Sequence, residues 1–179
     1  MHNILQQLLN DHINYSKLLT LLKNHISNIQ NGLDSDFHET YLIMKYMVNY
    51  PDIFHHPFEE VLFRQFITLH GETTELIEKT SYEHQKLSEL GQKLINELEI
   101  VISGNVTSRQ LIIDTAEEYL NMMYAHMDTE ESKVFPLIDE KLSSEDWALV
   151  EAQIEHVKDP IFGDVISREF KQLYEAITE

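Results

Sequence analysis

Apolar residues recur at intervals of three and four along almost the whole chain, the spacing that places side chains on one face of an α-helix. Only five glycines and four prolines occur, and no segment keeps the alternation of a β-strand. The pattern breaks at residues 31–36, 69–74 and 103–108. It predicts a first helix over about 3–29, a second helical region to about 69, a third helix to about 102 and a fourth to about 140.

Local signals mark where these helices start and where one of them is interrupted. Capping residues are expected at Asp36 with Glu39, at Thr107 or Ser108, and at Ser143 with Asp146. Pro51 and Pro57 interrupt the second region, and because a proline inside a helix costs about 3 kcal/mol, they predict a kink or a restart there. The segment KDPIFGD at 158–164 predicts a turn before a last amphipathic helix.

Four long helices joined by short loops predict an all-α fold, an up-down antiparallel four-helix bundle with short C-terminal helices. The chain has 179 residues and no long linker, so we expect a single domain over 1–179. The bundle would span about 3–140, and a C-terminal helical extension would span about 141–179.

Each of the four long helices carries a histidine on its apolar stripe: His12, His55, His84 and His126. In two helices a glutamate follows one turn later on the same face, Glu59 in the second region and Glu130 in the fourth helix. Buried carboxylates need cations or hydrogen-bond donors, and no lysine or arginine lies on these stripes at the same level. Metal ions are therefore the expected partners, and imidazole with carboxylate suits iron, manganese or zinc.

The two halves of the chain repeat this arrangement. His12 in NDH lies 43 residues before His55, and His84 in YEH lies 42 residues before His126. A repeat of two helical hairpins would place four histidines and two glutamates at one level of the core. Two carboxylates on facing helices can bridge two ions there, and the imidazoles can complete the coordination.

A second pair with the same spacing, His56 and Glu60, lies one residue further along the second region. This pair continues a row of polar positions that we expect to be solvated, whereas the first pair continues the apolar stripe. The sequence therefore favours the first pair, and the same argument favours Glu130 over Glu131. The histidines without such a partner are expected at the surface: His2, His25, His38, His70 and His156.

The composition limits the partners of the chain. The net charge is −18 with only 13 lysines and arginines, so nucleic acid and anionic membrane surfaces are not expected to bind. The absence of cysteine excludes disulfides, zinc ribbons and thiol catalysis. No apolar run reaches the roughly 18 residues of a membrane span, and the first helix lacks the pattern of a signal peptide. We therefore expect a cytoplasmic location.

Four segments resemble the hemerythrin-like family, also called HHE cation-binding proteins: NDH at 10–12, YPDIFHHPFEEVLF at 50–63, YEH at 82–84 and HMDTEESKVFPLI at 126–138. Two tail segments, LSSEDWALV and DPIFGD, are similar to those that follow the bundle in one bacterial branch. The resemblance implies a four-helix bundle with a non-haem di-iron centre, so two Fe ions are the expected cofactor, although other divalent metals could occupy it. It implies terminal ligands at His12, His55, His84 and His126 and bridging ligands at Glu59 and Glu130.

One departure from the family pattern concerns a fifth histidine. Oxygen-carrying hemerythrins have it one turn from the third-helix histidine, where this chain has Thr80 and Ser88. The fifth histidine is therefore missing unless His56 or Glu60 supplies a ligand, and a centre with four imidazoles is expected to oxidise in air. The set is similar to that of di-iron proteins implicated in repairing nitrosatively damaged iron centres. The Glu-x-x-His motif of ferritin-like proteins does not occur.

These inferences predict a non-haem di-iron protein that binds or reacts with a small diatomic or peroxidic ligand: oxygen, nitric oxide or peroxide. Its role would lie in sensing, stress defence or iron handling. Two alternatives stay open. One is a di-iron enzyme that removes peroxide or nitric oxide or repairs iron centres, which turnover would reveal. The other is an iron-responsive interaction module, which metal-dependent folding with a partner contact would reveal.

Overall fold

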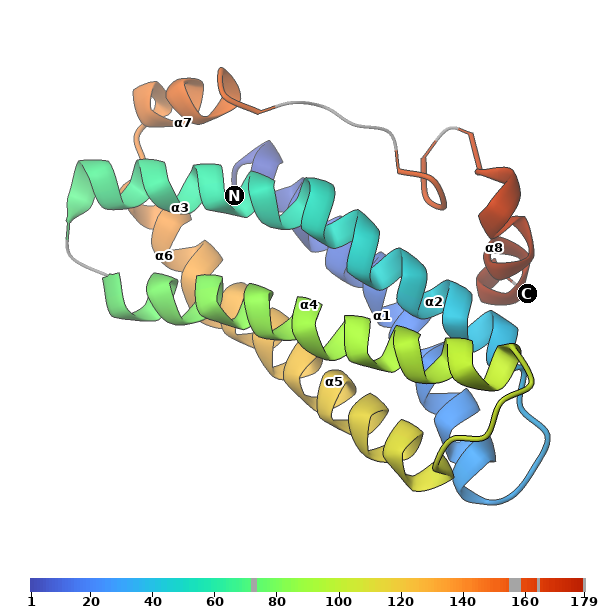
Figure 1. Ribbon diagram of the computed structural model, residues 1–179. Coiled ribbons are helices and arrows are strands. Elements are labelled where there is room, and N and C mark those ends of the chain that lie inside the picture. Colours follow the sequence, from blue (N-terminus) through green and yellow to red (C-terminus); the bar gives the residue numbers. More distant parts are fainter. Residues whose placement is uncertain (72–73, 155–158, 164, 179) are drawn as a thin grey trace.

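The computed structural model describes residues 1–71, 74–154, 159–163 and 165–178, and within these ranges it contains helices and no strand (Figure 1). The bundle consists of α1 (Asn3–Gln30), α2 (Phe37–Tyr50) with α3 (His56–His70), α4 (Thr74–Ile102), and α5 (Arg109–Thr129) with α6 (Phe135–Lys141). The predicted all-α fold is confirmed, and the breaks predicted at 31–36 and 103–108 fall between these helices. Residues 72–73 of the break predicted at 69–74 lie outside the described residues.

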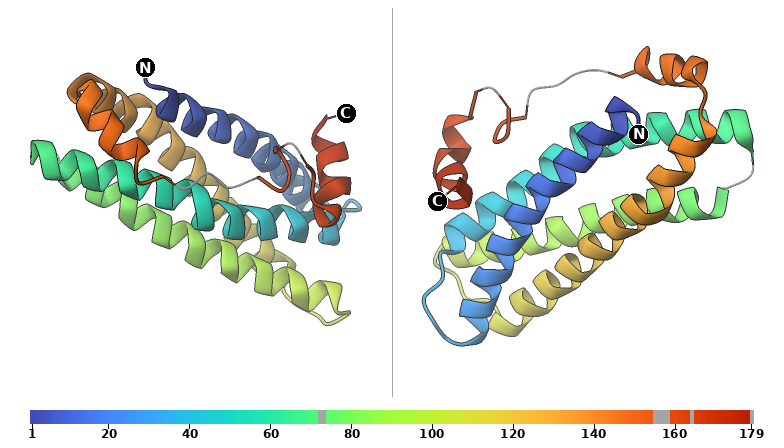
Figure 2. Two further views of the ribbon diagram at one scale, coloured as in Figure 1. Left: turned by 90° about the horizontal axis from the view of Figure 1, so that it is seen from above. Right: turned by 180° about the vertical axis from the view of Figure 1, so that it is seen from behind.

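The helices run alternately up and down, so that each lies antiparallel to the next along the chain (Figures 1 and 2). Helix α4 packs against α2 and α5, and α1 packs against α5 and α2, which closes the bundle. Gly91 allows the close approach of α4 to α2, because a Cβ atom at this position would clash with Cγ2 of Val48. The histidine-bearing faces of all four helices therefore point to one interior.

Two one-turn π-helical segments join the halves of the second and fourth bundle helices: η1 (Pro51–His55) and η2 (Glu130–Val134). In η1 the N–H group of His56 donates to the carbonyl oxygen of Pro51, and in η2 the N–H group of Phe135 donates to that of Glu130. A π turn contains one more residue than an α turn, so it shifts the face on which the following residues lie. Pro57 follows in the first turn of α3, where a missing N–H group costs little.

The apolar core is divided into two clusters. The larger cluster contains Tyr15 of α1 and Met127 of α5 and extends to Ile161, Phe170 and Leu173 of the C-terminal part. The smaller one contains Leu8 of α1, Leu62 of α3 and Val134 of η2. Along each bundle helix, the residues of one cluster are separated from those of the other by a short interval that contains a buried histidine or glutamate. The core therefore consists of two apolar blocks with a polar layer between them.

The C-terminal part of the chain lies along the outside of the bundle (Figures 1 and 2). Helix α7 (Ser144–Glu151) contacts α3, and α8 (Lys171–Thr178), which follows the 3₁₀ turn η3 (Arg168–Phe170), contacts α1 and α2. The carboxylate of Asp159 accepts hydrogen bonds from the N–H groups of Ile161 and Phe162 at 2.7 and 2.8 Å. It also accepts one from the hydroxyl of Tyr46 at 2.8 Å, which fixes this turn on α2.

The helix ends follow the predicted capping signals. The Ser143 and Asp146 capping box is present, and Ser108 accepts a hydrogen bond from the N–H group of Leu111. Asp36 caps α2 through the N–H group of Glu39. No helix in the described ranges is both long and apolar enough to cross a membrane.

Candidate metal site

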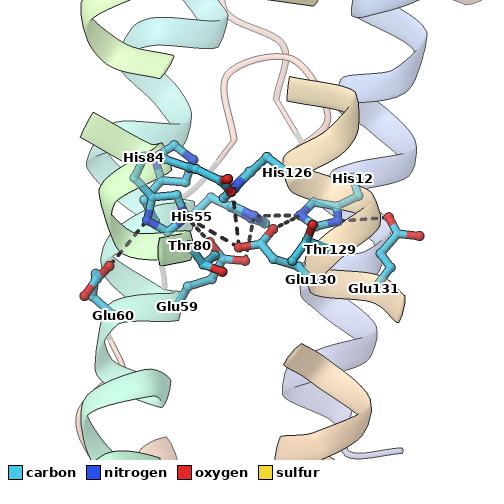
Figure 3. A network of polar contacts seen from close by, with 12 residues as sticks. His12, His55, Glu59, Glu60, Thr80, His84, His126, Thr129, Glu130 and Glu131 are labelled. Atoms are coloured by element: carbon cyan, nitrogen blue, oxygen red, sulfur yellow. Dashed lines mark hydrogen bonds and ion pairs between the residues drawn. The ribbon is translucent and has the colours of Figure 1, made fainter. Parts of the chain in front are cut away.

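Five buried histidines and two buried glutamates converge between the two apolar blocks. Figure 3 shows four of these histidines, His12, His55, His84 and His126, and both glutamates reaching inward from the bundle helices. We call these seven residues the polar layer: His12 of α1, His55 of η1, His56 and Glu59 of α3, His84 of α4, His126 of α5 and Glu130 of η2. Both glutamates are fully inaccessible to solvent. The six side chains that the sequence predicted thus lie together, and His56 lies with them.

The first group of donor atoms comes from α1, η1 and α3. Nε2 of His12 lies 3.1 Å from Nε2 of His55, which lies 3.3 Å from Oε1 of Glu59. Nε2 of His12 also lies 3.4 Å from Oε2 of Glu130. Atoms that bind one ion at about 2.1 Å lie about 3.0 to 3.4 Å apart in octahedral or tetrahedral geometry, so these four atoms have the spacing of ligands to a common ion.

The second group comes from α3, α4 and α5. His56, His84 and His126 each offer a nitrogen within 4.8 Å of the others. Oε1 of Glu130 lies 3.4 Å from Nε2 of both His84 and His126, and Oε2 of Glu59 lies 3.3 Å from Nε2 of His84. Each glutamate therefore points one oxygen at the first group and the other oxygen at the second.

The polar atoms at the centre of the layer lack hydrogen-bond partners. All four carboxylate oxygens of Glu59 and Glu130 and the Nε2 atoms of His84 and His56 make no hydrogen bond among the described residues. Nδ1 of His84 makes no hydrogen bond either, but it lies 3.3 Å from a carboxylate oxygen of Glu60. Buried carboxylates without donors are costly, and native proteins rarely leave several such groups together. Imidazole and carboxylate donors that converge without partners fit metal ions, so the layer fits a pair of ions held between two shared glutamates.

A carboxylate orients each of the five imidazoles from outside the layer. The Nδ1 atoms lie 2.9 to 3.3 Å from these oxygens, in the pairs His12–Glu131, His55–Asp11, His56–Asp52, His84–Glu60 and His126–Glu83. Figure 3 shows Glu60 and Glu131 on the outer sides of the layer. A partner at Nδ1 fixes the ring and leaves Nε2 free to bind an ion, the usual arrangement for metal-binding histidines.

These outer contacts assign roles to the repeated motifs. The acidic residue of NDH, Asp11, orients the histidine of the second region, and Glu83 of YEH orients that of the fourth helix. Glu60 and Glu131, which directly follow the two shared glutamates, orient His84 and His12. The sequence had favoured Glu59 over Glu60 and Glu130 over Glu131 for the interior, and the geometry agrees with both choices.

His56 corrects the sequence interpretation. It was expected to be solvated, but its exposed fraction is 7 %, and its ring stacks on that of His84 at 4.0 Å. The reason is the π segment, which ends at His55 and allows two successive residues to face the interior. The second half of the chain has no equivalent of this histidine. Met127 stands at the position that matches His56, and Met123 stands at the position that matches Asp52. The sequence feature that could have indicated a buried His56 is Asp52, an acidic residue one helical turn earlier.

Burial and charge separate the pKa values in the layer. Burial opposes protonation of His55, but Glu59 and Asp11 outweigh it and raise the pKa of His55 to about 10. In the same way, Glu130 and Glu59 raise the pKa of His84 to about 11 against the effect of burial. Burial and the charge of Glu59 raise the pKa of Glu130 to about 8. Without a metal ion, His55, His84 and Glu130 are therefore protonated near neutral pH, and these protons occupy sites that a bound cation would take.

In the other two histidines of the second group, His126 and His56, the pKa is lowered instead of raised. Burial and the charge on His84 lower the pKa of His126 to about 2. Burial, opposed in part by Asp52, lowers the pKa of His56 to about 4. Both rings are thus neutral at physiological pH, which is the state in which an imidazole binds a metal ion.

His25 is a second correction, because it is buried although it was expected at the surface. Its Nε2 atom lies 2.6 Å from the carboxylate of Glu39, and its Nδ1 atom lies 3.2 Å from the hydroxyl of Ser35. Glu39 therefore ties α2 to α1 through this histidine. Of the other histidines expected at the surface, His38 is exposed, whereas His156 lies outside the described residues.

An open groove of about 580 Å³ reaches the polar layer from the surface. His56 and His84 form its inner end, and Asp52, Glu60 and Arg64 line its sides. In the first group, the ring of Tyr15 packs edge-on against that of His55. The layer is therefore buried but is approached by solvent next to the second group.

The family model described as the hemerythrin HHE cation-binding domain matches residues 3–138 of the chain. This range covers all seven residues of the polar layer and ends within α6. No curated protein and no solved structure matches the chain.

Proposed function

Because the chain belongs to the hemerythrin HHE cation-binding family, we propose that the polar layer binds two iron ions and that a small ligand, oxygen, nitric oxide or peroxide, reacts there. One observation carries the proposal: Glu59 and Glu130 each direct one unpartnered oxygen at each histidine group. Two cations are the simplest partners for such a pair of shared carboxylates. Ferrous ions would supply electrons and open coordination positions for the small ligand.

The chain itself gives the two positions different surroundings. His12 and His55 would hold one ion, and His56, His84 and His126 would hold the other, with the two glutamates between them. The position with two imidazoles has fewer protein donors, so it is the one that keeps more room for a small ligand. Tyr15 and Phe135 pack against the rings of this group at 5.1 and 5.8 Å, and these walls limit the entry of water.

His56, as a fifth imidazole, changes the assumption behind the predicted oxidation in air. Rapid oxidation in air was expected from a centre with four imidazoles, whereas the layer offers five. Stopped-flow mixing of the reduced protein with oxygen measures whether the reaction is reversible. Manganese and zinc suit the same donors.

Metal content tests the proposal directly. The protein, purified without oxygen and reconstituted with ferrous iron, should contain close to two irons per chain by elemental analysis. Its optical spectrum should change on exposure to air. A metal content near zero after reconstitution, with the protein folded by circular dichroism, would show that the polar layer is not a metal centre.

Turnover of peroxide or nitric oxide is the second candidate, and the groove beside His56 and His84 favours it. An open groove permits a substrate to enter and a product to leave, which a stoichiometric binding site does not require. Consumption of many equivalents of peroxide or nitric oxide per chain, with a reductant present, would distinguish an enzyme from a binding protein.

A further inference from the structure

We propose that Tyr15, Tyr46 and Tyr50 form a redox relay that conducts oxidising equivalents from the polar layer to the protein surface when a hydroperoxide is reduced there. The proposal rests on the di-iron function proposed above. It gives the chain a further activity, which is the oxidation of small phenols at a site remote from the metal centre.

The three tyrosine rings form a continuous series that begins at a histidine of the first group. The ring centroid of Tyr15 lies 5.1 Å from that of His55, at an interplanar angle of 77°. Tyr15 lies 6.3 Å from Tyr46, which stacks on Tyr50 at 5.2 Å and an angle of 14°. Rings at these separations are in van der Waals contact, so an electron can pass along the series in short steps.

The series starts in the core and ends at solvent. Tyr15 and Tyr46 are 0 % and 1 % exposed, whereas Tyr50 is partly exposed. Tyr50 lines an open surface groove of about 360 Å³ together with Ile53 and Phe54. Tyr46 also borders this groove but is almost fully covered, and Tyr15 does not border it. A small molecule can therefore reach Tyr50 most readily and cannot reach Tyr15.

The hydroxyl of Tyr15 is difficult to explain by packing alone. It is buried beside the polar layer and has no hydrogen-bond partner among the described residues. A buried hydroxyl without a partner costs about 1 to 3 kcal/mol, so phenylalanine would stabilise the core more. A phenol does what a phenyl ring does not: it loses one electron together with its proton and becomes a neutral radical.

Tyr46 has the proton acceptor that such a step requires. Its hydroxyl donates to Oδ2 of Asp159 at 2.8 Å, which is within the range for direct proton transfer. The N–H groups of Ile161 and Phe162 hold the other oxygen of Asp159 in place. Burial raises the pKa of Asp159, so the carboxylate accepts and keeps a proton more readily than an exposed aspartate. When an electron leaves Tyr46, its proton can pass to Asp159 and return later.

The overall step is balanced with the hydroperoxide as oxidant. Hydrogen peroxide takes two electrons and two protons, its O–O bond breaks, and two water molecules form. Two phenols of the relay supply these electrons and protons and become two phenoxyl radicals. An electron from Tyr46 restores Tyr15, and one from Tyr50 restores Tyr46, each together with a proton that replaces the one lost. Two soluble phenols then each give a hydrogen atom at Tyr50, which replaces the two electrons and two protons taken by the peroxide and leaves two soluble phenoxyl radicals as products.

The test uses the iron-loaded full-length protein and three variants: Tyr46→Phe, Tyr50→Phe and the control Tyr119→Phe. Tyr119 is equally buried, at 2 % exposure, but lies outside the series. Each protein is mixed with one equivalent of hydrogen peroxide and frozen. Electron paramagnetic resonance with ring-deuterated tyrosine then detects tyrosyl radicals, and peptide mapping locates the oxidised tyrosines. Iron content and optical spectra show whether each variant keeps its centre.

The wild type and Tyr119→Phe should show a tyrosyl radical, oxidation at Tyr50 and oxidation of an added phenol. Tyr46→Phe should keep its iron but lose both oxidation at Tyr50 and oxidation of the phenol. Tyr50→Phe should retain a buried radical and lose phenol oxidation. Oxidation of Tyr50 at the wild-type level in Tyr46→Phe would overturn the relay. So would iron-loaded wild type that consumes peroxide without any tyrosyl radical, which would leave the di-iron function standing. A chain that takes up no iron would overturn both.

Discussion

Neighbouring glutamates in the sequence have different surroundings in this protein. Glu59 is fully buried and lies between the two histidine groups, whereas the side chain of Glu60 is 43 % exposed and contacts the outer nitrogen of His84. Glu130 and Glu131 differ in the same way. The inner member of each pair faces both histidine groups, and the outer member lies against the Nδ1 atom of one ring.

Replacing these glutamates separately tests this division. Glu59→Ala should remove most of the bound metal, because the remaining carboxylate alone would face two cations. Glu60→Ala should weaken metal binding only by about 10- to 100-fold, the usual effect of losing a residue that orients a ligand. Elemental analysis and a competitive chelator titration measure both effects. Equal or greater loss in Glu60→Ala would mean that Glu60 is itself a ligand.

His56 is the residue that makes the two groups unequal. His56→Met introduces the side chain that the other half of the chain carries at Met127, so the packing should tolerate it. Without this imidazole the second ion should bind more weakly, and metal content should fall from about two towards one per chain. His38→Met, at an exposed histidine, is the matched control. Full loading of His56→Met at limiting iron would show that His56 is not a ligand.

Among the structural elements, the π segments decide which residues reach the polar layer. An α-helix would turn His56 away from the face that His55 occupies, whereas η1 brings both rings inside. The second π segment, η2, begins at Glu130, whereas η1 ends four residues before Glu59, so the two halves of the bundle change their helical geometry at different points relative to the shared glutamate.

Removal of one residue from η1 tests this role. Ile53 is 58 % exposed, so its deletion should convert the π turn into an α turn with little loss of core packing. We expect helix content to remain, while one of the two imidazoles leaves the interior and metal content falls. Deletion of Val106, which is 97 % exposed in a loop, is the control. Undiminished metal binding after deletion of Ile53 would contradict a role for the π turn.

At the scale of the whole molecule, the polar layer divides the apolar core into two blocks. Without ions, its seven ionisable side chains place unpartnered carboxylate oxygens at the centre of the bundle. Metal binding should therefore stabilise the fold by more than local contacts alone, because the ions connect all four bundle helices.

Metal removal should lower the thermal midpoint of unfolding. A ligand that binds only the folded state adds about 2.7 kcal/mol to the free energy of unfolding at a free concentration 100 times its Kd. Calorimetry of the iron-loaded protein and of the protein stripped with a chelator measures the difference. Identical midpoints, despite two bound metals, would mean that the bundle is fully formed without them and that binding is weak.

The pKa values predict that metal uptake releases protons. In the metal-free protein at pH 7, His55 and His84, with pKa values of about 10 and 11, and Glu130, with a pKa of about 8, carry protons that ligands must lose. Metal affinity should therefore rise with pH between about pH 6 and pH 8. Proton release can be followed with a pH indicator in weak buffer during titration with metal. An affinity that falls across this range would contradict these protonation states.

The sequence by itself determined the helices and most of the polar layer. Apolar spacing defines an amphipathic stripe, and a histidine or glutamate on such a stripe must enter the core, so His12, Glu59, His84 and Glu130 could be placed without coordinates. Gly32, Gly71 and Gly104 lie in the predicted breaks between helices, and Pro51 and Pro57 marked the interruption in the second region.

Only the tertiary structure decided the place of His56 and the roles of the outer carboxylates. Helical periodicity assumes a constant rotation per residue, and a π turn breaks that assumption locally, so the face of His56 could not be read from its spacing. The pairing of Asp11 with His55 joins residues on different helices, and stripe patterns carry no information about contacts between helices. The series from Tyr15 to Tyr50 likewise crosses from α1 to α2 and exists only once those helices pack together.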